Sequence, residues 1–371
     1  TYSTKTTMAS ITCPICPSDA SYLDDVVFVS SCTTIDIVNS CNIDLDPLTF
    51  YRTYVAASKP CLIRGAISKW PALKKWNDST KDHILEKCTD TTRCLQKCGR
   101  DRLVTCNYTP NGNGDHILND HDKINSNDGP IFVKPEERQV EFGVAWDQLK
   151  QTEEHQHHQH LHGVPYLSIQ NDSLREEFAC LGQDIDIDGL PFLSKVFDKE
   201  ALSAINLWIG DHRSVSSVHK DPFDNIYCVV KGTKTFTLLP PTDVRFLYEK
   251  AFPIGSYHLQ TNSLKWQVRK EKGVVPWCQV DPAIPDLTRF PKFRHASPLH
   301  VEVKAGETLF LPALWYHRVG SKDGLTIAVN YWYDMNFGPL YTAYTLARRV
   351  SGLKPEHEYD ESDLIVEGTK E

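Results

Sequence analysis

The residue pattern most able to do chemistry is His219-Lys220-Asp221, considered together with His317 farther along the chain. Side chains two positions apart on a strand point to the same side, so His219 and Asp221 could hold one metal ion while Lys220 faces away. A strand that returns beside the first would supply His317, and the interval of 317 − 221 = 96 residues leaves room for several strands. Two histidines and one carboxylate are the ligand set of non-haem Fe(II) oxygenases. A hydrogen-bonded His–Asp pair is the ordinary alternative.

A second group of polar residues could hold an acidic co-substrate beside such an ion. A dicarboxylate that chelates Fe(II) through one end needs a buried cation at its other end. Lys234 can supply that cation as a compact point charge. The polar residues expected around it, on strands that flank the metal ligands, are Tyr166, Ser216, Asn225, Tyr227, Asn330 and Trp332. Each taken singly is equally well a satisfied polar residue of a core, so the interpretation depends on all of them together.

Short β-strands separated by turn residues dominate the second half of the chain and must position these side chains. The expected strands are 204–209, 214–220, 225–230, 233–239, 301–303, 308–312 and 325–332. Lys231-Gly232-Thr233 predicts a tight hairpin between two of them. Many short strands predict a sandwich or barrel. Residues 250–298 are rich in Pro and aromatic residues and are expected to be a long excursion that forms a rim of the active site.

The first half of the chain predicts helices and strands that support this β structure. Short helices are expected at 48–55, 70–76 and 139–149, and strands at 60–66, 104–108 and 165–170. The His-rich tract 153–162 is predicted to be a solvated insertion rather than a metal site. Residues 1–42 are rich in Ser, Thr and Cys without a sustained period and are predicted to be a flexible extension. The CxxC motif of Cys13 and Cys16 supplies two of the four ligands of structural zinc; Cys32 and Cys41 could complete the set, but nothing in their spacing demands it.

A final helix is predicted from Pro339 to about Val350. The apolar stripe of this helix consists of Leu340, Tyr341, Tyr344, Ala347 and Val350. This stripe either packs on its own domain or forms a homodimer contact. The charged residues 355–371 are expected to fray. The predicted divisions are the extension 1–42, a helix and strand support region 43–160, a catalytic core 161–338, and a C-terminal helix and tail 339–371.

Composition and charge restrict the class of protein. The net charge of −8 over 371 residues argues against direct binding to the phosphate backbone of nucleic acids. Twelve cysteines are too thinly spread for a small disulfide scaffold. No apolar run approaches the ~20 residues of a membrane helix. Because no secretion signal is recognisable, we expect a protein of the cytoplasm, or of the cytoplasm and nucleus, with no membrane partner.

These motifs together resemble the JmjC (jumonji-C) family of 2-oxoglutarate oxygenases. The positions that carry the resemblance are His219-x-Asp221, Asn225, Tyr227, Lys234, His317 and Asn330-x-Trp332. A narrower resemblance is to the subgroup of JmjC-domain-containing protein 7, and it is carried by residues 60–64, 70–73, 206–210, 219–222, 225–230, 311–317 and 328–335. The similarity covers most of the chain, from about residue 43 to about residue 350.

The resemblance implies a mostly β fold with flanking helices and a double-stranded β-helix (cupin-like, JmjC) core. His219, Asp221 and His317 would be the iron ligands, and Lys234 would pair with the C5 carboxylate of 2-oxoglutarate. The residues that would complete that pocket are Tyr166, Ser216, Asn225, Tyr227 and Asn330, with Trp332 lining it near the metal. The reaction would need Fe(II), 2-oxoglutarate and O2, with ascorbate as reductant. Ser216 stands where the subgroup more often has Thr, which preserves the hydroxyl.

The subgroup is associated with (3S)-hydroxylation of a lysyl residue in developmentally regulated GTP-binding proteins. A 2-oxoglutarate-dependent hydroxylase of a protein lysyl residue on such a GTPase is therefore the expected function. A histone lysine demethylase and a histone-tail endopeptidase are alternatives within enzymes, and a non-catalytic cupin-like scaffold is the alternative outside them. Members of the subgroup are similar to dimeric JmjC hydroxylases, which favours a homodimer through the C-terminal helix.

Overall fold

The computed structural model describes the chain over residues 34–39, 46–78, 80–90, 103–119, 129–150, 163–322 and 324–364. Contacts between Cα atoms divide the chain into two units, Thr1–Cys32 and Thr33–Glu371, and every described residue belongs to the second. Most of the predicted extension 1–42, its CxxC motif and the His-rich tract 153–162 lie outside the described residues.

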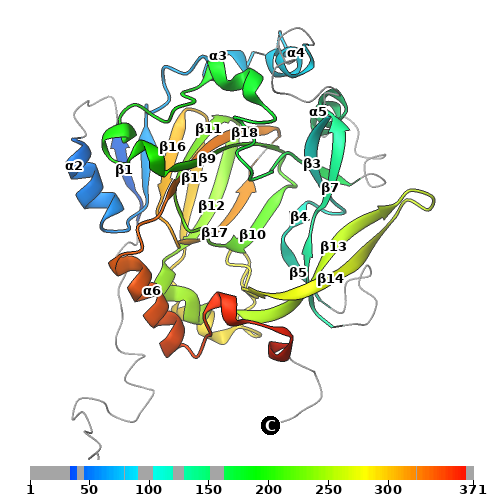
Figure 1. Cartoon of the computed structure of the whole chain (residues 1–371), viewed down its shortest axis with the longest axis vertical. Coiled ribbons are helices and arrows are strands. Elements are labelled where there is room, and N and C mark those ends of the chain that lie inside the picture. Colours follow the sequence, from blue (N-terminus) through cyan, green and yellow to red (C-terminus); the bar gives the residue numbers. More distant parts are fainter. Residues whose placement is uncertain are drawn as a thin grey trace, which may run out of the picture. The chain divides into compact units, whose positions relative to one another are not determined.

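Two facing β-sheets form the centre of this unit (Figure 1). The larger sheet consists, in spatial order, of β1 (Asp36–Asn39), β2 (Cys61–Arg64), β16 (Glu307–Leu311), β11 (Phe223–Lys231), β18 (Thr326–Asp334) and β9 (Leu202–Gly210). The other consists of β15 (Leu299–Lys304), β12 (Thr233–Leu239), β17 (Tyr316–Ser321), β10 (Val215–His219) and β4 (Asn113–Gly114). Because the chain passes from one sheet to the other as it runs from β9 to β12 and from β15 to β18, the predicted double-stranded β-helix is confirmed.

The turn at Lys231-Gly232-Thr233 joins the two sheets instead of closing a hairpin. Strand β11 pairs with β16 and β18, whereas β12 pairs with β15 and β17. Gly232 has φ = +73°, a backbone conformation that favours glycine. The predicted turn is therefore present but the predicted hairpin is wrong, because turn residues show where a chain reverses and not which strand becomes its neighbour.

Helices cover the outer face of the larger sheet. They are α2 (Pro47–Phe50), continued by a wide helical turn over Tyr51–Val55, α3 (Pro71–Lys75), α4 (His83–Thr89) and α5 (Phe142–Lys150). The strand period of two directs Ile226, Cys228 and Val230 of β11 into this apolar core. The alternate residues Asn225 and Tyr227 consequently face the space between the two sheets.

Two smaller sheets lie beside the core. One has the order β7 (Glu136–Glu141), β3 (Leu103–Thr109), β8 (Val164–Tyr166), and the other β14 (Lys265–Trp277), β13 (Lys250–Gln260), β6 (Ile131–Lys134), β5 (His116–Leu118). The long hairpin of β13 and β14 corrects the prediction of an excursion without strands at 250–298 (Figure 1). The helix predicted from residue 139 begins at Phe142, because residues 139–141 still belong to β7. The strand predicted over 165–170 ends at Tyr166.

The C-terminal helix α6 (Pro339–Val350) has the predicted bounds, and Leu340, Tyr344 and Ala347 of its predicted apolar stripe pack against the core. Its buried residues are Tyr344 and Arg348, while Tyr341 and Val350 are 40% and 55% exposed. Residues 355–364 do not fray from the core as predicted; they form two short 3₁₀ turns, Glu356–Glu358 and Glu361–Asp363. Strand β1 likewise corrects the prediction of a structureless stretch up to residue 42, since it pairs in parallel with β2.

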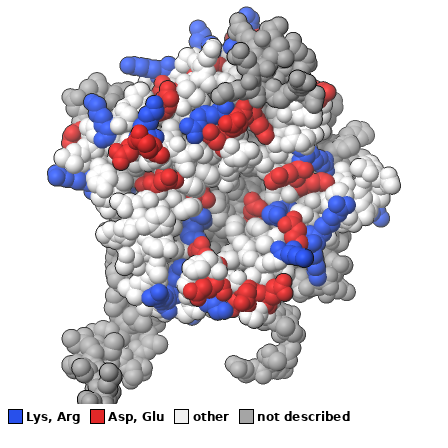
Figure 2. Space-filling view, in the orientation of Figure 1, with Lys and Arg blue, Asp and Glu red and all other residues white. Residues whose placement is uncertain are grey.

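Charged side chains of both signs are interspersed over the face of the described residues that Figure 2 shows. None of the described helices combines the length and the apolar character that crossing a membrane requires.

Candidate metal and co-substrate site

Two neighbouring antiparallel strands bring the predicted histidine ligands together. His219 on β10 stands opposite His317 on β17, and their ring centroids are 4.2 Å apart. His219 Nδ1 lies 2.7 Å from the Ser217 carbonyl oxygen, and His317 Nδ1 lies 2.9 Å from that of Trp315. Because a carbonyl oxygen only accepts, each ring carries its proton on Nδ1 and keeps Nε2 available as a metal ligand.

Asp221 supplies a carboxylate to the same place, although not by strand alternation. Strand β10 ends at His219, and the Asp221 carbonyl accepts a hydrogen bond from Leu314 N at 2.9 Å. Asp221 Oδ2 lies 3.5 Å from His317 Nε2 and 4.0 Å from His219 Nε2. One ligand atom from each of the three residues lies within 4.8 Å of the others, which is close enough for a single metal ion. The two-residue period therefore does not position Asp221; the loop after β10 does.

The electrostatics of these three groups suit a divalent cation. Burial, followed by the neighbouring His317, lowers the pKa of His219 to about 4. Burial opposes ionisation of Asp221, but the adjacent rings of His317 and His219 hold its pKa below the usual range. Neutral imidazoles and an ionised carboxylate are the forms that bind metals.

Lys234 is buried between the sheets without a counter-ion among the described residues. Its Nζ donates to Tyr166 Oη at 3.4 Å and lies 5.1 Å from the centroid of the Tyr166 ring. Burial lowers the pKa of Lys234 to about 7, and Asp211 only partly offsets this effect. The Asp211 carboxylate is itself paired with Arg213 at 2.7 Å. A buried ammonium is unfavourable unless it is paired, so an anionic ligand at this place would stabilise it.

The surroundings of Lys234 offer donors that a carboxylate could use. The rings of Tyr166, Trp208 and Tyr227 form a continuous wall, with centroid separations of 6.0 Å and 6.4 Å. Tyr227 Oη and Trp332 Nε1 are buried and have no hydrogen-bond partner in the described part of the chain. One unpaired ammonium and two unsatisfied donors fit an acidic co-substrate that carries acceptor oxygens.

The other predicted co-substrate residues lie at the same place but bond to protein groups. Asn330 Nδ2 donates to Asn225 Oδ1 at 3.1 Å, and Trp208 Nε1 donates to Asn330 Oδ1 at 2.8 Å. The Ser216 side chain hydrogen-bonds the Tyr166 hydroxyl. These three residues therefore order the pocket walls, and their contact with a co-substrate stays a prediction.

Two aromatic residues beside the predicted metal ligands were not singled out from the sequence. Trp277, the last residue of β14, stacks on His219 with a centroid distance of 6.5 Å and an interplanar angle of 6°, and its Nε1 donates to Ser217 Oγ at 3.2 Å. Phe223 stacks on Trp332 at 4.7 Å. Trp277 lies outside every predicted strand but within residues 250–298, the stretch expected to form a rim of the active site; its pairing with Lys250 across the long hairpin fixes its position.

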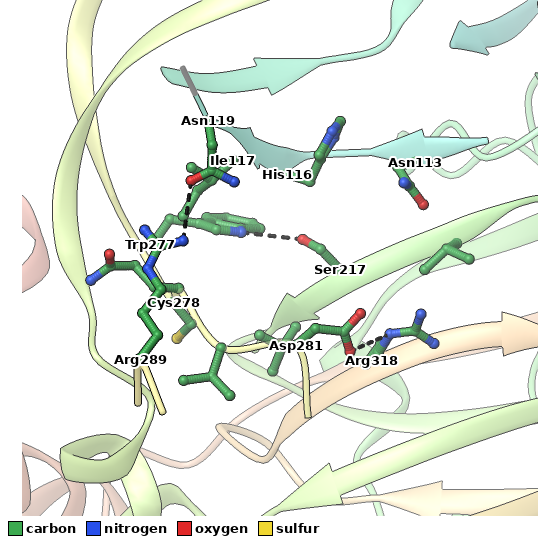
Figure 3. A pocket seen from close by; sticks show the side chains of 14 residues that line it. Asn113, His116, Ile117, Asn119, Ser217, Trp277, Cys278, Asp281, Arg289 and Arg318 are labelled. Atoms are coloured by element: carbon green, nitrogen blue, oxygen red, sulfur yellow. Dashed lines mark hydrogen bonds and ion pairs between the residues drawn. The ribbon is translucent and has the colours of Figure 1, made fainter. Parts of the chain in front are cut away.

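Trp277 also separates His219 from a cavity of about 240 Å³. Figure 3 shows the indole among the residues that line this cavity, with Ser217 on one side of it. Farther along the wall, Arg318 is paired with Asp281 at 2.8 Å.

Comparison with known proteins agrees with this arrangement. Residues 47–339 match the Cupin-like domain family. Lysine-specific demethylase JMJ32 of Arabidopsis thaliana is 36% identical over 335 residues, which cover 85% of this chain and 88% of that protein. JmjC domain-containing protein E of Dictyostelium discoideum is 33% identical over 325 residues, covering 82% and 86%. Bifunctional peptidase and (3S)-lysyl hydroxylase JMJD7 of Homo sapiens is 34% identical over 302 residues, covering 81% and 85%. The chain therefore belongs to the cupin-like JmjC family of 2-oxoglutarate oxygenases, close to the JMJD7 subgroup.

Proposed function

We propose that this JmjC oxygenase hydroxylates C3 of a lysyl residue in a protein, and that the protein is a developmentally regulated GTP-binding protein. The observation that carries the oxygenase chemistry is the meeting of His219, Asp221 and His317 within reach of one ion, beside the unpaired Lys234. The lysyl substrate is supported by the 34% identity to human (3S)-lysyl hydroxylase JMJD7. The GTPase is supported by the resemblance of the motifs to that subgroup.

In this proposal the chain holds its cofactor and co-substrate through fixed groups. Nε2 of His219 and His317 and the Asp221 carboxylate would bind Fe(II), and the hydrogen bonds on the two Nδ1 atoms keep the imidazoles oriented. When bound, Fe(II) with 2-oxoglutarate and O2 supplies the oxidising power to convert an unactivated C–H bond to C–OH, with succinate and CO2 as the other products. The protein contributes orientation and exclusion of water.

Lys234 would pair with the far carboxylate of 2-oxoglutarate, and the Tyr227 hydroxyl would donate to the same ligand. Trp332, held by its stack on Phe223, would line the pocket on the metal side. Tyr227 and Trp332 come from the neighbouring strands β11 and β18 of the larger sheet, and Lys234 comes from β12 of the facing sheet, so a bound ligand would be enclosed by both sheets.

The reaction class can be tested with paired lysyl peptides, one unmodified and one N-methylated, incubated with protein, Fe(II), 2-oxoglutarate and ascorbate. The proposal predicts that the unmodified peptide gains one oxygen atom while succinate forms in equal amount. Asp221→Ala should form neither product. If the methylated peptide releases formaldehyde and the unmodified peptide gains no oxygen, the reaction is demethylation and not hydroxylation.

Demethylation is the second candidate because JMJ32, a similarly close relative, is called a lysine-specific demethylase. Cleavage of the peptide backbone without any need for 2-oxoglutarate would instead support the peptidase activity that the name of JMJD7 includes.

A further inference from the structure

Lys220, the residue between two of the predicted metal ligands, points away from them and toward the C-terminal segment. Its Nζ lies 2.6 Å from Glu356 Oε1, and its side chain is only 14% exposed. The same ammonium lies 5.4 Å from the Tyr316 ring centroid and 5.6 Å from that of Tyr344. The ion pair therefore joins the metal-binding loop to the first 3₁₀ turn after α6.

Glu356 is itself held by a buried network on α6. The Tyr344 hydroxyl donates to Glu356, and Arg348 Nη1 lies 3.3 Å from Glu356 Oε1. Arg348 also forms a two-pronged ion pair with Glu249, at 2.7 Å and 2.8 Å, and both side chains are almost fully buried, at 4% and 3% exposed. Arg348 Nη2 fixes the following loop by donating to the Lys354 carbonyl oxygen at 2.6 Å.

The charges of this network balance as they stand. Lys220 and Arg348 are positive, and Glu249 and Glu356 are negative. Lys220 brings a positive charge next to ligands that must hold a cation, and in a poorly solvated site such like charges repel strongly. Glu356 cancels this charge, and because Lys220 is covalently between His219 and Asp221, the ion pair also restrains the backbone that presents both ligands.

We propose that Glu356 is a positioning residue of the metal site. Through Lys220 it holds the His219–Asp221 segment in ligating geometry and neutralises the charge beside it. This inference rests on the metal site of the proposed function. It assigns the C-terminal segment a part in metal affinity, although His219, Asp221 and His317 all lie outside that segment.

The test is a double-mutant cycle read out as metal affinity. Co(II) is titrated into the metal-free full-length protein by calorimetry, and the absorption spectrum of the bound Co(II) reports the ligand geometry. Glu356→Gln should weaken Co(II) binding about tenfold, equivalent to ~1.4 kcal/mol, and change that spectrum. In a Lys220→Met background, where no charge needs cancelling, the same change should weaken binding by less than about twofold.

The exposed pair of Glu302 and Lys322, at 2.8 Å, offers a matched control. Glu302→Gln removes the same kind of contact from the surface of the molecule and should leave Co(II) affinity and spectrum unchanged. Glu356→Asp keeps the negative charge and should retain part of the affinity that Glu356→Gln loses. This second variant keeps the test decisive if Glu356→Gln folds poorly.

Equal weakening by Glu356→Gln in the unaltered protein and in the Lys220→Met background would overturn the inference, since it would indicate a general packing effect. Unchanged affinity in Glu356→Gln would overturn it as well. Asp221→Ala should abolish the Co(II) binding of the unaltered protein. If the unaltered protein binds no Co(II), or if Asp221→Ala binds it equally well, the metal site of the proposed function fails, and the inference fails with it.

Discussion

At the scale of single residues, protonation decides what the site can hold. Burial keeps His219 neutral while Asp221 stays ionised, and this pairing presents two lone pairs and one negative charge to a cation. Lys234 is the opposite case, because burial works against its charge and no described acid pairs with it. The site therefore has one place suited to a metal and another suited to a carboxylate.

The pH dependence of 2-oxoglutarate affinity should reveal Lys234. Its pKa of about 7 without ligand lies below the usual value, so the ammonium loses its proton as the pH rises through that value. Since pairing with a carboxylate needs the proton, affinity should fall from about pH 7 to about pH 9, by up to about tenfold per unit. Calorimetry of Mn(II)-loaded protein in two buffers should also show proton uptake on binding. Lys234→Met should bind 2-oxoglutarate weakly, and its affinity should not depend on pH in this range. If Lys234→Met keeps the pH profile of the unaltered protein, Lys234 is not the partner of the carboxylate.

Asp221→Ala should remove most metal affinity, by about 100-fold or more, because two neutral imidazoles remain without a negative charge. Asp224→Asn provides the control. Burial raises the pKa of Asp224 to about 6, and its Oδ1 accepts from Ala313 N at 3.0 Å, a bond that an amide oxygen can keep. Metal titration of both variants checks the assignment. Equal losses in the two would point to a loop effect rather than to ligation by Asp221.

Single residues were also the most predictable part of the site. The cluster of His219, Asp221 and His317 and the buried Lys234 could be picked out from the sequence, because the chemistry expected of them is restricted to few residue types. Trp277 could not, because an aromatic residue has many roles in a core and this one reaches His219 only through the pairing of β13 with β14.

At the scale of elements, the two sheets position the site through strand register. The pairing of β10 with β17 sets His219 opposite His317, and the pairing of β11 with β18 sets Tyr227 opposite Asn330. Alternation predicted most of these strands, but not their partners, since pairing depends on contacts far apart in the chain. Strand β14 was missed because Lys270, Glu271 and Lys272 are consecutive and exposed, which hides the period of two.

The turn between the sheets should be sensitive to a side chain at Gly232. An added Cβ would lie 2.7 Å from Thr326 Cγ2 and 2.9 Å from the Leu325 carbonyl oxygen, at φ = +73°. Gly306 has a similar φ of +88°, but no atom lies within 4 Å of the position that its Cβ would take. Substitution of Gly306 therefore measures the cost of the backbone conformation without a steric clash. We expect Gly306→Ala to lower the free energy of unfolding by about 1–2 kcal/mol and Gly232→Ala by about 2–4 kcal/mol. Equal losses in denaturant unfolding would show that the turn adapts.

At the scale of the whole molecule, exposed apolar residues of α6 support the proposed homodimer. Leu346 and Val350 are 54% and 55% exposed on this helix, and Phe337 just before it is 71% exposed. Exposed apolar side chains that lie close together are typical of protein interfaces. Light scattering should therefore give the mass of two chains, and Leu346→Glu combined with Val350→Glu should give that of one. Replacing the exposed Ile284, which is 78% exposed and distant in sequence, should leave the mass unchanged. A single-chain mass for the unaltered protein at every concentration would refute the dimer.

The sequence indicated only part of the face that α6 buries. Leu340, Tyr344 and Ala347 of the predicted apolar stripe pack against the core, whereas Tyr341 and Val350 are exposed. The buried face also carries Arg348, because Glu249 supplies a buried partner. An ion pair between residues 99 positions apart cannot be recognised from helical periodicity.

The product that the oxygenase forms tests the proposed reaction and substrate most directly. The measurement is the intact mass of a developmentally regulated GTP-binding protein after incubation with this protein, Fe(II), 2-oxoglutarate and ascorbate, followed by fragmentation to locate the change. We predict a gain of one oxygen atom on a lysyl side chain, absent when the enzyme carries Asp221→Ala. No change in mass while succinate accumulates would contradict the proposed substrate, and no succinate under any of these conditions would contradict the oxygenase itself.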